Sequence, residues 1–218
     1  MPTCYLAGAA PGARDPAPPI APGDFVIAAD GGCGLLRQWG LTPDLIIGDL
    51  DSLAGPLPEG VPCIRAPAEK DETDMELALL EGVSRWYRVF GILGGYGGRP
   101  DHTIANLQLL AKAAQMGARA VLHAGSWRCA ALCGGTPAGE LALRGKGIVS
   151  VFAWGAKAEG VTIAGMKYPL AGEDLDSTAP RGVSNELDGE GRVTLEKGIL
   201  LCFWEETIQS RTGANKND

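Results

Sequence analysis

Two aspartates, Asp49 and Asp51, follow the apolar run 45–47 and the intervening Gly48. An apolar run that ends in Gly and Asp is typical of a buried strand entering a turn. In an open parallel sheet, ligands bind outside the carboxyl ends of the strands, so both carboxylates would face a ligand. Their mutual repulsion calls for a cation, and their oxygens suit Mg²⁺. The pair therefore predicts a magnesium-assisted site, with a solvent-facing turn as the alternative.

Two other segments carry polar residues where a helix should begin. Asp30-Gly31-Gly32 follows the apolar run 25–29 and precedes a helical pattern, a geometry in which backbone approaches a phosphate or ribose. The alternative is that Asp30 only caps the helix. Lys70 and Asp74 are one helical turn apart, so a cation and a carboxylate can project together toward a metal-bound phosphate. For the neighbouring acidic residues, capping of the helix is the alternative.

A glycine-rich loop at 94–98 follows the strongest strand pattern in the chain, residues 87–93. So many glycines in one loop indicate close approach by something that leaves no room for side chains. Arg99 has planar donors suited to phosphate oxygens, and Asp101 takes the leading position at the next helix start. His102 is expected to be structural rather than a base, and Asn106 adds a polar contact one turn further on.

The order of apolar patterns predicts two domains. Strands and helices alternate up to residue 125, including a helix expected over 103–116, which indicates a mostly parallel sheet covered on both faces. We expect residues 1–125 to form a Rossmann-like three-layer αβα domain. After residue 125, short apolar stretches such as 140–143 and 148–154 are separated by Gly and Pro turns. They predict an antiparallel β-sandwich or roll over residues 126–218.

Composition narrows the choice of partners and compartment. The formal net charge is -7 and the chain has no cluster of Lys and Arg, which argues against nucleic acid and suits a cationic substrate. The amino terminus lacks the pattern of a signal peptide, and no apolar run approaches the length of a membrane span. We therefore expect a cytoplasmic protein without membrane contact. The six cysteines form no Cys-x-x-Cys pair and are expected to be small buried hydrophobes.

Taken in order, the motifs resemble those of the thiamine pyrophosphokinase family along nearly the whole chain. The matching segments are Ala29-Asp30-Gly31-Gly32, Gly48-Asp49-Leu50-Asp51-Ser52, residues 70–76, residues 97–102 with Asn106, residues 165–170 and residues 182–186. The resemblance implies transfer of a pyrophosphoryl group from ATP to the hydroxyl of thiamine. The products are thiamine diphosphate and AMP. It also implies Mg²⁺ as cofactor and a homodimer.

The resemblance also implies a role for each matching residue. Asp49, Asp51 and Asp74 would hold Mg²⁺, and Asp101 would orient or deprotonate the thiamine hydroxyl, with a metal-ligand role equally open. The residues on the ATP side would be Asp30, Gly31, Gly32, Ser52, Lys70, Thr73, Arg99, His102 and Asn106. Ser184 and Asn185 match thiamine contacts, with a polar β-turn as the alternative. Apart from the resemblance, thiamine is a cationic heteroaromatic whose pocket should include an apolar or aromatic wall. Trp127 or Trp154 would supply this wall, with a place in the core as the alternative.

Two rival functions remain open at this point. The first is another Mg²⁺-dependent phosphotransferase or nucleotide hydrolase on the same carboxylates, which would consume ATP without thiamine or release the γ-phosphate. The second is a non-catalytic regulator that binds thiamine or nucleotide. Such a regulator would be expected to have lost part of the acidic set, whereas Asp49, Asp51, Asp74 and Asp101 are all present.

Overall fold

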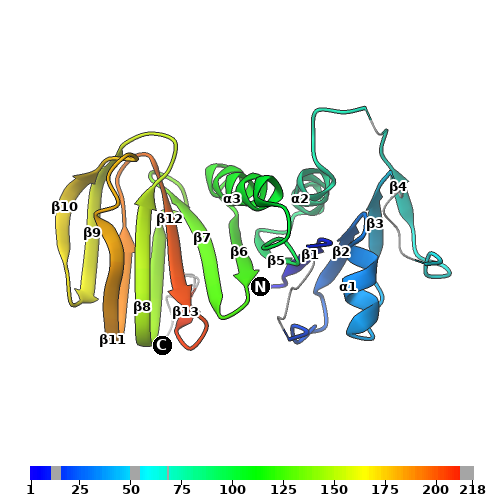
Figure 1. Ribbon diagram of the computed structural model, residues 1–218, viewed down its shortest axis with the longest axis horizontal. Coiled ribbons are helices and arrows are strands. Elements are labelled where there is room, and N and C mark those ends of the chain that lie inside the picture. Colours follow the sequence, from blue (N-terminus) through cyan, green and yellow to red (C-terminus); the bar gives the residue numbers. More distant parts are fainter. Residues whose placement is uncertain (11–15, 50–54, 68, 212–218) are drawn as a thin grey trace. The chain divides into compact units, whose positions relative to one another are not determined.

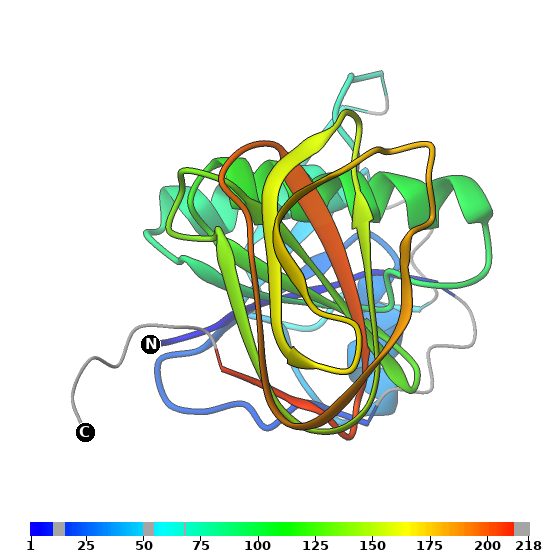
Figure 2. The ribbon, with the colours of Figure 1, turned by 90° about the vertical axis from the view of Figure 1, so that its left-hand side faces the viewer.

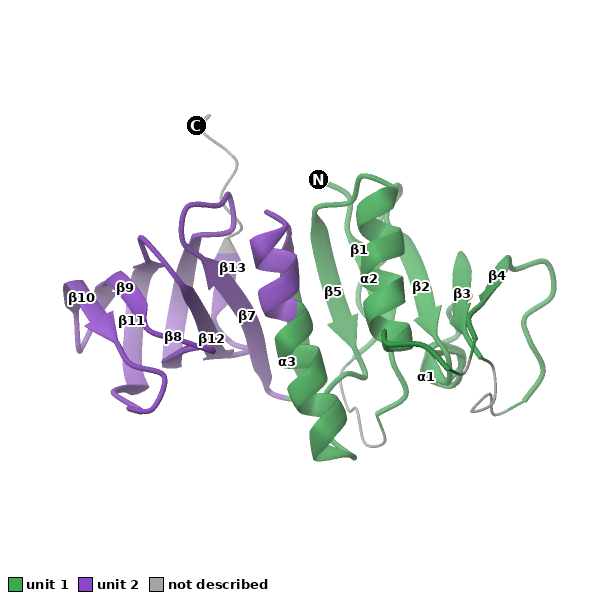
Figure 3. Ribbon diagram, turned by 90° about the horizontal axis from the view of Figure 1, so that it is seen from above, with its two compact units in different colours: residues 1–109, 120–125 green, residues 110–119, 126–218 purple. Residues whose placement is uncertain are grey.

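The computed structural model of the chain describes residues 1–10, 16–49, 55–67 and 69–211 (Figure 1). It divides into two compact units, coloured separately in Figure 3. Unit 1 comprises residues 1–109 and 120–125, and unit 2 comprises residues 110–119 and 126–218. Two of the predicted site residues, Asp51 and Ser52, lie outside the described residues.

Unit 1 is built around a sheet with the strand order β6-β5-β1-β2-β3-β4. Its elements are β1 (Cys4–Ala7), β2 (Phe25–Ala29), α1 (Gly32–Gln38), β3 (Leu45–Gly48), β4 (Cys63–Arg65), α2 (Asp74–Ser84), β5 (Val89–Leu93), the first part of α3 (Pro100–Gln115), and β6 (Arg119–Ala124). Each neighbouring pair from β5 to β4 is parallel. The expected parallel sheet is thus confirmed for these five strands.

Helices α1 and α2 each bury an apolar face against this sheet. Cys33 and Leu36 of α1 belong to one buried cluster with alternate strand residues, including Val26, Ala28 and Ile46. Helix α2 approaches the sheet through Gly82. A Cβ atom there would lie 2.5 Å from the Phe90 ring and 3.0 Å from Cys4 Sγ. A larger residue at that position would push α2 away from β1 and β5.

The helix starts differ in detail from the sequence predictions. Helix α3 begins at Pro100 rather than at Thr103, because proline at the first helical position loses no hydrogen bond. The N-cap of α1 is Gly31, and no side chain caps this helix, so Asp30 is not its cap. Helix α2 is capped by Thr73, whose hydroxyl accepts a hydrogen bond from the Glu76 backbone N–H.

Unit 2 is an antiparallel arrangement of strands, as the sequence predicts (Figure 2). Its strands are β7 (Trp127–Cys133), β8 (Glu140–Ala153), β9 (Ala158–Met166), β10 (Leu170–Leu175), β11 (Gly182–Thr194), β12 (Ile199–Glu205) and β13 (Gln209–Arg211). The order is β10-β9-β11-β8-β12-β7, and β13 pairs with β8.

Strand β8 corrects one prediction. The sequence indicates separate strands at 140–143 and 148–154, whereas the structure has one continuous strand of 14 residues. The glycines between the two apolar runs do not form a turn. They leave space for residues 205–208, which lie against this part of β8. A Cβ atom at Gly147 would lie 2.3 Å from Glu205 Oε2, and one at Gly145 would lie 3.2 Å from the Ile208 backbone.

The helices of the described residues include none with both the length and the apolar character to cross a membrane. All six cysteines are free, and four of them are buried: Cys4, Cys33, Cys129 and Cys202. Burial raises the pKa of Cys4 and of Cys202 to about 12. Cys63, on the outer strand β4, is exposed.

We expect a thiol reagent at pH 8 to modify Cys63 quickly, and Cys4 and Cys202 only after unfolding. The reason is that the buried thiols stay protonated far above pH 8, and the thiolate is the reactive form. Mass spectrometry of peptides after timed alkylation measures this. Cys63→Ser should remove the fast label, and rapid labelling of Cys202 in the folded protein would contradict the packing of β12.

Candidate active site

The predicted site residues of unit 1 gather where its parallel strands end. The arrowheads of β5 and β2 in Figure 3 point to the edge at which α2 and α3 begin. The strand ends are joined by backbone hydrogen bonds: Gly8 N donates to Leu93 O at 2.8 Å, and Asp30 N donates to Ile47 O at 2.8 Å. The turns after β1, β2, β3 and β5 therefore share one edge of the sheet, where ligands bind in such folds.

Several glycines at this edge allow one backbone to lie against another. A Cβ atom on Gly32 would lie 1.9 Å from the Ala7 carbonyl oxygen, and one on Gly94 would lie 2.5 Å from the Gly8 carbonyl oxygen. Gly94 also has a φ of +59°, which favours glycine. From the sequence, we expect these glycines to make room for a ligand. The structure shows instead that both are small because another part of the backbone packs against them.

Asp30 and Asp49 lie on adjacent turns of this edge. A Cβ atom on Gly48 would be 3.0 Å from Asp30 Cβ, so the end of β3 passes directly beside Asp30. Asp30 adopts a φ of +46°, a left-handed conformation that aspartate tolerates better than most residues. Asp49, the next residue after β3, is half-buried. Two carboxylates thus arrive here from neighbouring strands.

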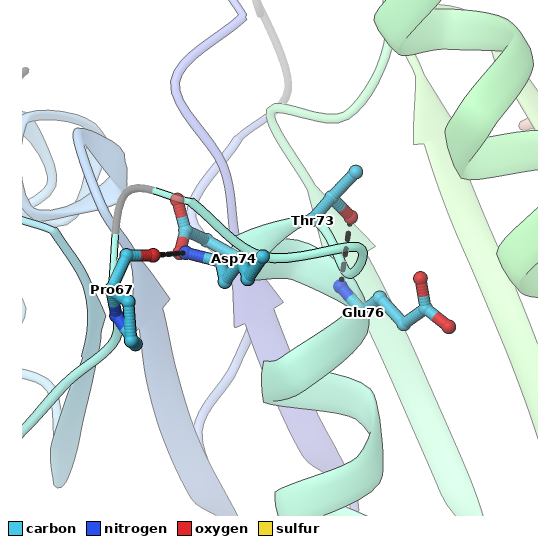
Figure 4. A network of polar contacts seen from close by, with 5 residues as sticks. Pro67, Thr73, Asp74 and Glu76 are labelled. Atoms are coloured by element: carbon cyan, nitrogen blue, oxygen red, sulfur yellow. Dashed lines mark hydrogen bonds and ion pairs between the residues drawn. The ribbon is translucent and has the colours of Figure 1, made fainter.

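The start of α2 supplies a paired cation and carboxylate (Figure 4). Lys70 Nζ lies 2.8 Å from Asp74 Oδ1 and 3.2 Å from the Pro67 carbonyl oxygen. The side chains are mostly shielded, with exposed fractions of 14% for Lys70 and 23% for Asp74. Thr73, the N-cap of α2, fixes the start of the helix next to this pair by accepting a hydrogen bond from Glu76 N at 3.2 Å. The sequence prediction that Lys70 and Asp74 project together is confirmed.

The glycine-rich loop is tied to α3 on both sides of Tyr96. Asn106 Nδ2 donates to the Gly95 carbonyl oxygen at 2.7 Å, and Gly97 N donates to Thr103 Oγ1 at 3.3 Å. Asn106 is buried, with 8% of its surface exposed. Its side-chain amide therefore holds the loop in place, a contact that was not predicted from the sequence. The loop is fixed before any ligand arrives.

Arg99 and Asp101 form a two-pronged ion pair at the start of α3. Arg99 Nη2 lies 2.6 Å from Asp101 Oδ2, and Nε lies 3.2 Å from Oδ1. Both side chains are exposed. The hydrogen bond from Arg99 lowers the pKa of Asp101, and the backbone N–H of His102 adds to this effect. A carboxylate with a lowered pKa is a weak base, so this arrangement favours an orienting role over proton abstraction. His102 itself is exposed on α3.

The described residues do not by themselves complete the expected metal site. In the ranges that the structure describes, no three His, Cys, Asp or Glu side chains are grouped closely enough to hold a metal ion. The predicted set of Asp49, Asp51 and Asp74 includes Asp51, which falls outside those ranges. The two described members have the oxygen donors that Mg²⁺ prefers.

In unit 2, Ser184 and Asn185 lie in strand β11 and not in a β-turn. The pairing with β8 is irregular between Gly182 and Asn185, and Ser184 has a φ of +59°. Its backbone N–H donates to Ser150 Oγ at 3.0 Å, and its side chain is exposed. Left-handed strain in a non-glycine residue persists only where the surroundings fix it, and it is frequent at binding sites.

Asn185 has a different position from Ser184. It is buried, with its Oδ1 accepting from Tyr168 N and Glu186 N, both at 2.9 Å, while Nδ2 donates to the Tyr168 carbonyl oxygen at 2.8 Å. The amide thus fixes the turn between β9 and β10. Tyr168 is 57% exposed, and Lys167 Nζ lies 5.4 Å from its ring centroid. Tyr168 lies within the motif at 165–170, but its residue type alone predicts no role for it.

Two family models match successive parts of the chain. Residues 20–122 match "Thiamin pyrophosphokinase, catalytic domain", and residues 141–200 match "Thiamin pyrophosphokinase, vitamin B1 binding domain". The chain belongs to the thiamine pyrophosphokinase family. This family assignment confirms the resemblance seen in the sequence motifs.

Relatives in the thiamine pyrophosphokinase family match along most of the chain. Thiamine pyrophosphokinase of Bacillus subtilis (strain 168) is 29% identical over 186 residues, which cover 81% of this chain and 85% of the relative. A crystal structure of the Bacillus subtilis protein matches with a TM-score of 0.80 and 25% identity, covering 93% of this chain and 98% of that one. A family protein from Enterococcus faecalis matches with a TM-score of 0.77 and 26% identity, covering 94% and 99%.

Replacing Arg99 by methionine should raise the pKa of Asp101 toward its ordinary value, because the guanidinium that stabilises the carboxylate is lost. The carboxyl of the native protein should therefore keep its charge to lower pH than that of the variant. A pH titration followed by carboxyl ¹³C NMR measures both. The pKa of Asp176, lowered by its hydrogen bond from Thr178, serves as a control and should not move. An unchanged Asp101 titration would contradict the ion pair.

The effect of a substitution at Ser184 on the free energy of unfolding should depend on how well the new residue tolerates a positive φ. Ser184→Gly relieves the left-handed strain and should leave the free energy of unfolding unchanged or raise it by up to about 1 kcal/mol. Ser184→Val should lower it by about 1–3 kcal/mol, because β-branched residues avoid positive φ. Urea denaturation compares the two variants. Equal stabilities would show that residue 184 does not hold this conformation in solution.

Proposed function

We propose that this chain transfers a pyrophosphoryl group from ATP to the hydroxyl of thiamine, giving thiamine diphosphate and AMP. The observation that carries the proposal is the ordered match of a catalytic family model to residues 20–122 and a vitamin B1 binding model to residues 141–200. Residues 20–122 contain the charged groups that such a transfer needs, namely the paired Lys70 and Asp74 and the guanidinium of Arg99. The loop that precedes Arg99 is held by Asn106.

In the proposed reaction, the thiamine hydroxyl oxygen bonds to the β-phosphorus of ATP while the bond from that phosphorus to the bridging oxygen of AMP breaks. The hydroxyl proton leaves to a base or to water. Lys70 and Arg99 would bind phosphate oxygens, and Asp101 would orient the hydroxyl. Each cation is already paired with a carboxylate, which restricts its position before the phosphates bind. As the family resemblance implies, the ATP side would be completed by Asp30, Gly31, Gly32, Ser52, Thr73, His102 and Asn106.

The carboxylates of the proposed site fit a magnesium ion by their chemistry. Asp49 follows β3 and Asp74 begins α2, so the carboxylate oxygens that Mg²⁺ prefers would come from separate elements. We propose that Asp49, Asp51 and Asp74 hold Mg²⁺. When bound, the ion would neutralise charge on the phosphates during transfer.

The remaining features of the proposal follow the family assignment. Residues 1–125 would be a Rossmann-like αβα domain that binds ATP and Mg²⁺, and residues 126–218 a β-sandwich or roll that binds thiamine. Ser184 would contact thiamine directly through its exposed side chain. Asn185 would act through the turn that its amide holds. Trp127 or Trp154 would form an aromatic wall. The proposed enzyme would act in the cytoplasm as a homodimer.

We expect Asp49→Asn and Asp74→Asn each to lower turnover on the order of a hundredfold or more, because each removes charge that stabilises the transition state. The assay resolves AMP, ADP and thiamine diphosphate by chromatography after incubation with ATP, Mg²⁺ and thiamine. Asp188→Asn is the matched control, because Asp188 is exposed and forms an ion pair with Lys146 on the neighbouring strand β8. Chelation of Mg²⁺ should also stop the reaction.

The products decide between the proposed function and its rivals. Equal amounts of AMP and thiamine diphosphate, dependent on thiamine, would support pyrophosphoryl transfer. Release of ADP, or of AMP without thiamine, would keep a nucleotide-consuming site and overturn the proposed substrate. Binding of thiamine without any turnover in the native protein would favour a regulator.

A further inference from the structure

Tyr96 is distinguished from the other tyrosines by its surroundings. The chain has four tyrosines. Tyr5 packs against the unit 1 core cluster, Tyr87 stacks on Phe25 with ring centroids 5.9 Å apart, and Tyr168 meets the Lys167 ammonium. Tyr96 is 50% exposed, and among the described residues its side chain makes no hydrogen bond or ring contact. Its ring is available at the edge of the sheet where the site residues gather.

The backbone on both sides of this ring is already fixed. The carbonyl group of Gly95, just before Tyr96, is held by Asn106, and the N–H of Gly97, just after it, is held by Thr103. Gly94 is further constrained by its contact with Gly8. A tyrosine has few rotatable bonds, so a ring on a fixed backbone loses little conformational entropy when a ligand packs on it.

The residues that follow Tyr96 suit a ligand that joins a flat ring to an anionic group. Arg99, three residues on, presents an exposed guanidinium, and Ile104 is 52% exposed in the first turns of α3. Aromatic rings bind flat heterocycles by offset stacking and cations through the ring face. The loop thus offers an aromatic face and a cation within a short stretch.

We propose that Tyr96 is a specificity-determining residue that packs its ring against the aminopyrimidine ring of a substrate. This inference rests on the proposed function, in which both substrates carry such a ring: the adenine of ATP and the pyrimidine of thiamine. The chemistry of the contact is the same for both, and it acts on binding rather than on the phosphoryl step. It assigns a role to the one bulky residue between the glycines of the loop.

The test compares Tyr96→Ala and Tyr96→Phe with Trp86→Ala. Trp86 is a suitable control because it is 83% exposed and precedes β5, whereas Tyr96 follows the other end of that strand. Tyr96→Ala should raise KM about tenfold for one substrate, as expected for the loss of one stacked base, with kcat nearly unchanged. Tyr96→Phe should keep native KM values, and Trp86→Ala should do the same.

The substrate affected identifies the ring. A higher KM for ATP alone assigns the contact to adenine, and a higher KM for thiamine alone assigns it to the thiamine pyrimidine. Unchanged KM values in Tyr96→Ala would overturn the inference, and so would a loss confined to kcat or an equal effect of Trp86→Ala. Circular dichroism and thermal melting confirm that each variant is folded.

Direct titration separates failure of this inference from failure of the proposed function. Calorimetric binding of Mg·ATP and of thiamine to the native protein and to Tyr96→Ala needs no turnover. Weaker binding of either ligand to the variant supports the contact even if no thiamine diphosphate is formed. Equal affinities of the two proteins for both ligands overturn it even if the native protein makes thiamine diphosphate.

Discussion

The close approach of backbone to backbone at the carboxyl edge of unit 1 is the constraint on which the candidate site depends. Gly32 lies against the Ala7 carbonyl group, Gly94 against Gly8, and Gly48 against Asp30. Any side chain at these three positions would separate the strand ends. Because the turns touch directly, the polar residues that follow them are brought to one edge of the sheet.

Lys70 and Arg99, at this edge, are each paired with a carboxylate before a ligand arrives. Lys70 is paired with Asp74 and Arg99 with Asp101, each through a short contact. In a chain with a net charge of -7, isolated lysine and arginine side chains would be drawn to other carboxylates. Local pairing keeps them where the proposed phosphates would bind. The shielded pair at α2 is held more rigidly than the exposed pair at α3, since burial and the Thr73 cap limit its motion.

The pattern of neighbouring residues in the sequence was enough to predict most strands and one of the ion pairs. Most features that it did not predict depend on contacts between residues far apart in the sequence. The parallel strands, the antiparallel second half and the Lys70–Asp74 pair all follow from short-range periodicity. The continuous strand β8 did not, because Gly145 and Gly147 look like turn residues until the end of β12 and its connection to β13 are placed beside them. Likewise, the buried amides of Asn106 and Asn185 bind backbone 11 and 17 residues away, which no local pattern indicates.

Asn185 has a consequence for motion in unit 2. Its single carboxamide links the N–H and the carbonyl group of Tyr168 to strand β11, so the turn between β9 and β10 has no independent hinge at that residue. Opening the turn breaks contacts within the sheet, and the two segments should exchange their amide hydrogens as one cooperative unit. A binding surface made from such a turn is recognised as a preformed shape, and its fluctuations are as rare as those of the sheet that holds it.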